Sequence, residues 1–283
     1  MVAVAVVLVS AAACASAPSQ RSAAPPHSPV ATAITSPAAG GGTALSQAAQ
    51  RADVLARSHV PVLGYHQIRD WRPADSHSDR SIITPVAVFE QQMNTLVQLG
   101  YHTVTPDQLY RYLVSGSPLP SRPILISFDD GSMGQWPNAF PILRAHRFTA
   151  TFFIMTVTID KPGGWLSIRQ IQALDRSGMT IGIHTWDHHP VTGYTTADWR
   201  VQLTGAKSTL ERIVGHPVPW FAYPYGAWNA PALPHLADGG VVMAFQLAGR
   251  SSSSDAPLLT VRRLMPSPYW SMPTFANQLT SQF

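Results

Sequence analysis

Short apolar segments alternate with amphipathic segments from about residue 59 onward, and this alternation constrains the fold more than any other feature of the chain. Strands that alternate with helices form a parallel sheet, so the pattern predicts an α/β fold, either open or closed into a barrel. Continuous apolar segments of this length are typical of strands buried on both faces. The candidate strands are Val60–Tyr65, Pro123–Phe128, Ala150–Met155, Met179–Ile183, Val218–Ala222 and Val241–Gln246.

The segments between these strands carry helix start and stop signals. Capping boxes at Thr105 and Ser167, each followed three residues later by Gln, predict two helix N-termini, and Thr84 before Pro85 predicts a third. A longer helix is expected to end at Gly215. Its apolar stripe is Trp199, Leu203, Ala206, Leu210 and Ile213.

The N-terminal part differs in composition from the rest. The apolar run Val2–Val9 is too short for a membrane span, which needs about 20 residues. Small residues precede Cys14, so we expect residues 1–14 to be a signal peptide or a lipoprotein signal. Residues 15–57, rich in Ala, Ser and Pro, are expected to be a disordered tether, and residues 58–283 the folded domain. This predicts a protein that is secreted or anchored to the outer face of the cell membrane, with membrane contact only through lipid or an uncleaved signal.

Charge and cysteine content exclude several classes of function. The net charge is only +4, and the Lys and Arg residues are scattered, so we expect no nucleic-acid partner. The chain has one cysteine, which excludes an intrachain disulfide and a cysteine-ligated zinc site. Any metal site must therefore use His, Asp or Glu.

Polar residues suited to metal chemistry follow two of the candidate strands. Asp129 and Asp130 come directly after Pro123–Phe128, and adjacent carboxylates oppose joint ionisation unless a cation is present. His184 and His188 follow Met179–Ile183, and on one helical turn this spacing would place both imidazoles on one side. Because the carboxyl ends of parallel strands meet at one edge, a site of two His and one Asp is expected there. A simple Asp-Asp-Gly turn and ordinary surface histidines are the alternatives.

The segment FAYPYG, Phe221–Gly226, follows a third strand. Its Pro and Gly predict a rigid turn that could aim a backbone N–H into the same site. A packed aromatic loop is the alternative.

The three segments SFDDG, HTWDH and FAYPYG resemble, in the same order and at similar intervals, motifs of the polysaccharide deacetylases, carbohydrate esterase family 4. Tyr65-His66 and the segment Phe89–Leu109 resemble the branch that includes bacterial poly-N-acetylglucosamine deacetylases. The resemblance covers about residues 60–275. It implies a distorted (β/α)7 barrel as the catalytic domain, and a divalent metal, usually Zn²⁺, with Ni²⁺ or Co²⁺ as alternatives.

The resemblance also implies roles for individual residues. Asp129 matches the general base, and Tyr225 matches the residue whose backbone N–H helps to hold the oxyanion. Asp130, His184 and His188 match the metal ligands. Tyr223, Pro224, Trp186 and Trp228 are expected to contact substrate, although aromatic residues of this kind also pack barrel rims.

Two departures from the family pattern need an explanation. Ala222 stands where many members have the Arg that orients the base, and no Leu-x-His motif supplies the usual acid near the C-terminus. The segment Leu259–Ser267 occupies that region instead. His66 is our candidate acid, with a structural hydrogen bond as the alternative. His189 would replace His188 as ligand if the loop were not helical.

These observations predict a metal-dependent hydrolase that removes N-acetyl groups from N-acetylglucosamine-containing polysaccharide, using an Asp base and a metal-bound water. An O-acetyl esterase and a catalytically weak glycan-binding relative are the alternatives of the same fold. A non-haem iron oxygenase could use Asp130, His184 and His188, but Asp129 would then have no role.

Overall fold

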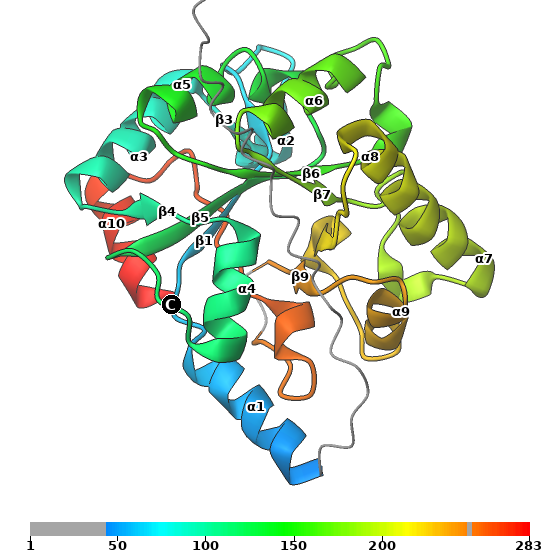
Figure 1. Cartoon of the computed structure of the whole chain (residues 1–283). Helices are drawn as coiled ribbons and strands as arrows, with labels where there is room; N and C mark the ends of the chain where they lie inside the picture. Colours follow the sequence, from blue (N-terminus) through cyan, green and yellow to red (C-terminus); the bar gives the residue numbers. More distant parts are fainter. Residues whose placement is uncertain (1–43, 248–250) are drawn as a thin grey trace, which may run out of the picture. The chain divides into compact units, whose positions relative to one another are not determined.

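A parallel sheet forms the centre of the computed structural model, which describes residues 44–247 and 251–283 (Figure 1). Its strands pair in the order β1-β5-β6-β7-β8-β9, and the short β4 also pairs with β5, always in parallel. The strands are β1 (Val62–Tyr65), β4 (His102–Thr103), β5 (Pro123–Phe128), β6 (Thr151–Ile154), β7 (Thr180–Ile183), β8 (Trp220–Ala222) and β9 (Met243–Phe245). A separate two-stranded parallel sheet joins β2 (Gln67–Ile68) to β3 (Ile83–Thr84).

The segment from Val261 to Leu264, called the closing segment below, connects the two edges of the main sheet. On one side Val261 pairs in parallel with Phe245, and on the other Leu264 pairs in parallel with Leu63. Backbone hydrogen bonds of 2.8–2.9 Å support both pairings. The curled parallel sheet and its surrounding helices confirm the expected fold class.

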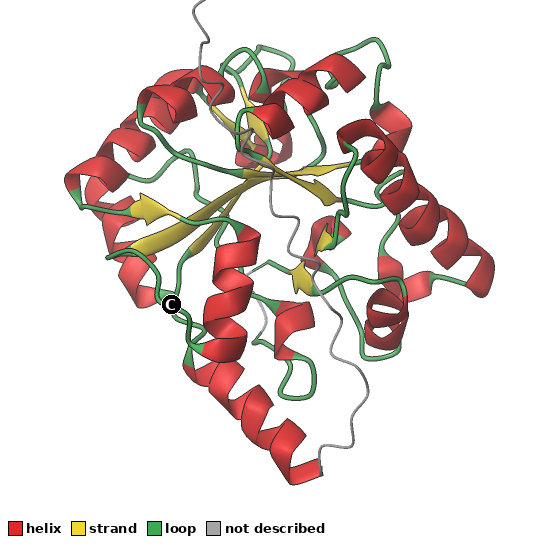
Figure 2. Cartoon of the chain, in the orientation of Figure 1, coloured by secondary structure: helices red, strands yellow, loops and turns green. Residues whose placement is uncertain are grey.

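Helices surround the sheet (Figure 2). They are α1 (Ala44–Ala56), α2 (His77–Ile82), α3 (Val86–Gln98), α4 (Pro106–Ser115), α5 (Ala139–Ala145), α6 (Ile168–Arg176), α7 (Thr196–Trp199), α8 (Ala206–Val214), α9 (Ala232–Asp238) and α10 (Met272–Ser281), with a π-helical turn at Arg200–Gly205. The expected capping boxes are present at Thr105 and Ser167. Gly215 ends α8 in the left-handed conformation that glycine adopts most easily.

Two expectations about helices need correction. Thr84 does not cap α3, because it belongs to β3 and the N-cap position is taken by Pro85, which makes no side-chain cap. The segment expected to be a tether up to residue 57 becomes helical at Ala44, and Val54 of α1 is buried, so the folded unit begins earlier than residue 58. The signal, the possible lipid site at Cys14 and the rest of the tether lie outside the described residues.

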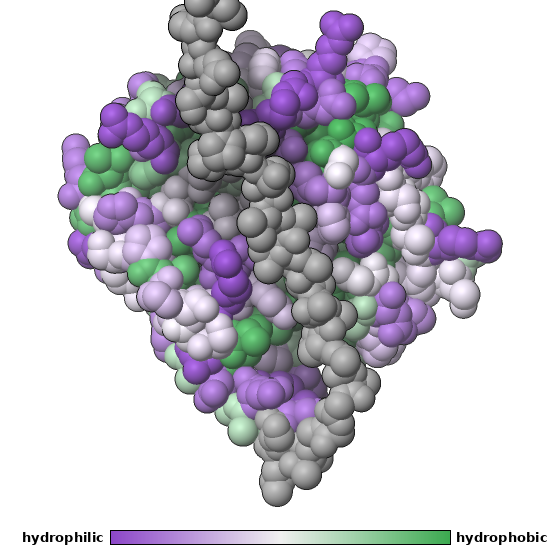
Figure 3. All heavy atoms as spheres, viewed as in Figure 1, coloured by the Kyte–Doolittle hydropathy of each residue, from purple (hydrophilic) through white to green (hydrophobic). Residues whose placement is uncertain are grey.

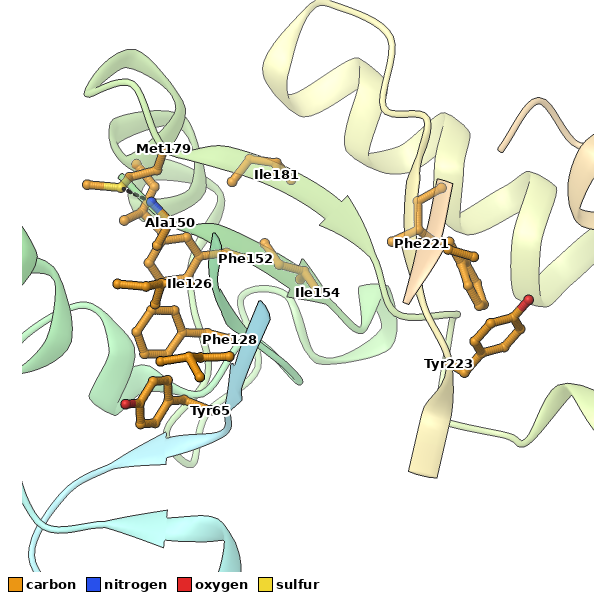
Figure 4. Close-up of a cluster of buried hydrophobic side chains, with 14 of the residues drawn as sticks. Tyr65, Ile126, Phe128, Ala150, Phe152, Ile154, Met179, Ile181, Phe221 and Tyr223 are labelled. Atoms are coloured by element: carbon orange, nitrogen blue, oxygen red, sulfur yellow. Dashed lines mark hydrogen bonds between the residues drawn. The ribbon is translucent and has the colours of Figure 1, made fainter. Parts of the chain in front are cut away.

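Aromatic side chains fill the space between the sheet and the helices. The rings of Tyr65, Phe128 and Phe152 stack across β1, β5 and β6, with centroids 5.6 and 4.9 Å apart (Figure 4). Successive strand residues face opposite sides, so Phe153 points to the other face. Gly182 on β7 makes room for it, because a Cβ there would lie 2.4 Å from the Phe153 ring. Both faces of the sheet are therefore closely packed, and its strand ends are held rigidly.

The surface mixes hydrophilic and hydrophobic side chains in the view of Figure 3. Among the described residues, no helix combines the length and apolar character needed to cross a membrane. Three large aromatic side chains in the described part of the chain are strongly exposed, namely Trp186, Tyr225 and Tyr269. Trp186 follows β7, Tyr225 follows β8, and Tyr269 follows the closing segment.

Candidate metal centre and active site

Asp130, His184 and His188 converge at the carboxyl ends of β5 and β7. The Nε2 atoms of His184 and His188 lie 3.4 and 3.5 Å from Oδ1 of Asp130. One ligand atom from each of the three residues lies within 4.8 Å of the others. Two imidazoles and one carboxylate at this spacing form a donor set suited to a divalent first-row metal with open coordination positions.

The backbone around these residues explains how they meet. His184 and His188 are not on a helix, so the expected helical turn is wrong, although the expected pair of residues does converge. Instead, Thr185 and His188 have φ angles of 65° and 70°, and Asp130 has 74°. Residues other than glycine rarely adopt this left-handed conformation, and it is concentrated at functional sites. His189 is 70% exposed and its ring lies beside Asp187, so it does not take the place of His188.

The hydrogen bonding of His184 orients its free nitrogen toward Asp130. Its Nδ1 lies 2.8 Å from the carbonyl oxygen of Ala222, which can only accept, so Nδ1 carries a proton and, in the neutral imidazole that binds metals, Nε2 has a free lone pair. Among the described residues, His184 Nε2 and Asp130 Oδ1 are buried without a hydrogen-bond partner. Buried polar atoms are normally paired, so two orphaned acceptors facing each other fit a bound cation.

Asp129 points to a different partner from Asp130. Its two oxygens accept hydrogen bonds of 2.7 Å from Nη1 and Nη2 of Arg263, in a bidentate pair. Both side chains are almost completely buried, with exposed fractions of 2% and 0%. Burial alone would raise the pKa of Asp129, but the Arg263 guanidinium and the neighbouring histidines lower it below its ordinary value. Asp129 is therefore an ionised carboxylate inside the protein.

Arg263 was not identified from the sequence, although two signals pointed to it. Ala222 lacks the expected Arg side chain, and Arg262-Arg263 interrupts the apolar segment Leu259–Ser267. The structure places Arg263 on the closing segment, where Nη1 also donates to Ser127 Oγ at 3.1 Å and Nε to the Gln246 carbonyl at 3.2 Å. A guanidinium from the other end of the chain thus occupies the position beside Asp129.

His66 follows β1 and faces the same carboxylate. Its Nε2 lies 3.9 Å from Asp129 Oδ2, and its side chain is 12% exposed. Gln135, a second residue missed from the sequence, donates from Nε2 to the carbonyls of His66 and Asp129, at 2.9 and 2.6 Å. This buried amide ties together the ends of β1 and β5, and so holds His66 beside Asp129.

The turn after β8 exposes one side chain and buries two. Tyr225 has a φ of 57°, is 68% exposed, and its ring centroid lies 4.4 Å from that of His188. Tyr223 and Pro224 are buried, and the Tyr223 hydroxyl donates to the Leu259 carbonyl at 2.7 Å. The expected substrate contact by these two side chains is therefore wrong, because the turn directs them into the core.

The two tryptophans expected to contact substrate differ in exposure. Trp186 is 41% exposed and is the residue directly after Thr185. Trp228 is half-buried, and its Nε1 donates to Gln246 Oε1 at 2.7 Å. Trp186 and Tyr225 are thus the accessible aromatic side chains among those expected to act at this site.

Residues 116–244 match the family described as polysaccharide deacetylase. The protein YxkH of Bacillus subtilis (strain 168) is 26% identical over 222 residues, which cover 78% of this chain and 76% of that protein. The poly-beta-1,6-N-acetyl-D-glucosamine N-deacetylase of Escherichia coli (strain K12) is 24% identical over 273 residues, covering 81% of this chain but only 40% of that enzyme. The structure of the Streptococcus pyogenes deacetylase PplD, in complex with acetate, covers 78% of this chain and 97% of its own, with a TM-score of 0.72 and 22% identity. At that identity the likeness is one of fold.

Proposed function

Because this chain contains a polysaccharide deacetylase domain, we propose that it is a metal-dependent hydrolase that removes N-acetyl groups from a polysaccharide containing N-acetylglucosamine. The observation that carries the proposal is the convergence of Asp130, His184 and His188 next to a buried, ionised Asp129. A binding protein would have no need for an unpaired donor set beside a charged base.

Asp130, His184 and His188 would hold the metal, with Zn²⁺ as the first candidate and Ni²⁺ or Co²⁺ as alternatives. Such an ion, when bound, polarises the acetyl carbonyl and makes water a better nucleophile. The orphaned His184 Nε2 and Asp130 Oδ1 support this assignment, as does the Ala222 carbonyl that fixes the tautomer of His184.

Asp129 is proposed as the general base that accepts a proton from the attacking water. Its ionised state supports this role, and the bidentate contact to Arg263 fixes the orientation of the carboxylate. Arg263 acts here as a positioning residue. It supplies the interaction that the Ala222 position lacks.

His66 is proposed as the acid that protonates the departing amine, because an amide nitrogen leaves poorly as an anion. Its position 3.9 Å from Asp129 supports proton transfer at the same centre. The backbone N–H of Tyr225 is proposed to stabilise the oxyanion. The next two N–H groups, those of Gly226 and Ala227, are already used in the hydrogen bonds that close the turn. Trp186 and the Tyr225 ring would contact the sugar.

The natural glycan is proposed by analogy with a relative. The Escherichia coli protein is named for poly-beta-1,6-N-acetyl-D-glucosamine, so that polymer is the first substrate to test. Peptidoglycan is the second, since another relative is the peptidoglycan-N-acetylglucosamine deacetylase PgdA of Listeria monocytogenes. Both substrates lie outside the cytoplasm. This agrees with the proposal that residues 1–14 direct the protein to the cell envelope or the medium.

The test is acetate release from N-acetylglucosamine oligomers by the full chain. It is measured with chelator, with Zn²⁺ added back, and with the Asp129→Asn variant. Release that Zn²⁺ restores and the variant abolishes is the expected result. No release from a folded, metal-loaded protein would contradict the proposal, and acetate release from an O-acetylated polymer alone would identify an esterase instead.

A further inference from the structure

The turn Thr185–His188 holds one proposed ligand in an unfavourable backbone conformation. Thr185 and His188 both have positive φ angles, 65° and 70°. Such conformations are unfavourable for residues other than glycine and persist only where the surroundings fix them. The contacts that hold this turn therefore determine where the His188 imidazole lies.

The carbonyl groups of the turn are held by the segment after β6. The N–H groups of Thr156 and Val157 donate to the carbonyls of Thr185 and Trp186, at 3.2 and 2.8 Å. Within the turn, the His188 N–H donates to Thr185 Oγ1 at 2.9 Å. These bonds leave the N–H groups of Trp186 and Asp187 to be paired by another element.

Gln202 pairs both of those N–H groups. Its Oε1 accepts from the N–H of Trp186 at 3.1 Å and, more weakly, from that of Asp187 at 3.4 Å. Its Nε2 donates to Asp187 Oδ1 at 2.7 Å. One side-chain amide thus holds two peptide N–H groups and one carboxylate of the turn, all within three residues of His188.

The setting of Gln202 distinguishes it from an ordinary polar residue. It is 6% exposed and lies on the buried face of its helix beside Leu203. Its helical segment, Arg200–Gly205, is π-helical, a rare geometry that is frequent at functional sites. A buried amide in an apolar stripe is unfavourable unless it is hydrogen-bonded, and here both Oε1 and Nε2 bond to the turn.

We propose that Gln202 is a positioning residue for His188, acting through the Thr185–His188 turn on the affinity of the metal site. Without its amide, the N–H groups of Trp186 and Asp187 lose their partner, and the turn relaxes away from its strained conformation. The His188 imidazole then moves relative to Asp130 and His184. This inference rests on the proposed function for the presence of a metal, but its test requires no substrate.

The experiment measures the Zn²⁺ affinity of the metal-free full chain by competition with a chromophoric chelator. Gln202→Met removes donor and acceptor at similar side-chain length, and Gln202→Asn keeps an amide that is too short to reach the turn. Loss of a residue that orients a ligand from outside typically weakens metal binding 10–100-fold, and this is expected for both variants. The visible spectrum of the Co²⁺-loaded protein is expected to change as well, because His188 no longer coordinates in the same way.

Gln172→Met is the matched control. The Gln172 Nε2 donates to the Ile213 carbonyl at 3.0 Å and links α6 to α8, away from the turn. This variant is expected to lose stability while binding Zn²⁺ with the affinity of the parent. Folded Gln202→Met that binds Zn²⁺ within twofold of the parent would overturn the inference, and if Gln202→Met does not fold, Gln202→Asn decides by the same limit. A parent that binds no Zn²⁺ would instead overturn the metal-dependent function.

Discussion

Replacing Arg263 by Met is expected to destabilise the fold strongly, because Asp129 then stays buried without a counter-charge. The carboxylate is 2% exposed and loses two hydrogen bonds of 2.7 Å. Hydrogen bonds to charged groups contribute about 1.5–3 kcal/mol each, so the two together amount to roughly 3–6 kcal/mol. Breaking a buried ion pair by removing one partner gives a similar range, about 3–5 kcal/mol. A loss near 4 kcal/mol corresponds to a fall in Tm of roughly 8–16 °C for a domain of this size.

The assay is urea unfolding at neutral pH with chelator present, so that metal loss does not contribute. Four proteins are compared, namely the parent, Arg263→Met, Asp129→Asn and the double variant. In the double variant no charge is left unpaired, so it is expected to be more stable than Arg263→Met. The coupling energy between the two positions is expected to be at least about 1 kcal/mol.

Arg262→Met controls for the loss of an arginine from the same segment. Arg262 lies over the Phe283 ring at 5.8 Å, a contact worth about 0.5–1 kcal/mol, so its replacement is expected to have a small effect. The reasoning is refuted if Arg263→Met costs no more than Arg262→Met. It is also refuted if the effects at Asp129 and Arg263 add within about 0.5 kcal/mol, the limit for independent sites.

Three further predictions concern other parts of the molecule. His66→Gln is expected to lower kcat on an N-acetylated oligomer by roughly 10²–10⁴-fold while leaving an activated acetate ester almost unaffected, and an equal loss on both would exclude a role as acid. Burial lowers the pKa of His216, but Asp175 at 2.8 Å and the Pro217 carbonyl together raise it above its ordinary value. The contribution of His216 to stability is therefore complete below the unfolded pKa and is lost as pH rises through the folded pKa. Asp175→Asn should therefore lower Tm more at pH 6 than at pH 8, and an equal loss at both would contradict this. Gly182→Ala is expected to cost about 1–3 kcal/mol because of overpacking, whereas Gly193→Ala, where a Cβ meets nothing within 4 Å, should cost little in the same urea titration.

Local signals predicted most of the secondary structure. The strand Pro123–Phe128 was found with its bounds, because a continuous apolar run between turn residues has few other folded forms. The buried face of a helix was harder to predict. Hydropathy alone does not show which residues beside an apolar stripe are covered by neighbouring elements. In α3, the apolar Val97 is 47% exposed, whereas the polar Gln92 is completely buried and accepts a hydrogen bond from the Tyr65 hydroxyl.

The candidate site, too, has a part that the sequence predicts and a part that depends on tertiary contacts. Asp130, His184 and His188 could be grouped from the sequence, because parallel strands bring their carboxyl ends to one edge. The turn that makes them converge could not, since left-handed φ angles at Thr185 and His188 depend on tertiary contacts. Arg263 and Gln202 depend on contacts between distant segments, and no local pattern encodes such a pairing.

The proposed metal ligands and the arginine that orients Asp129 come from different parts of the chain. The three proposed ligands all lie between residues 130 and 188. The guanidinium that fixes Asp129, in contrast, comes from 134 residues further along, on the segment that joins β9 to β1. Without this segment in place, Asp129 would lack its counter-ion even though the three proposed ligands lie elsewhere in the chain. Under the proposed function, competence for proton transfer therefore depends on completion of the sheet as well as on the three ligands.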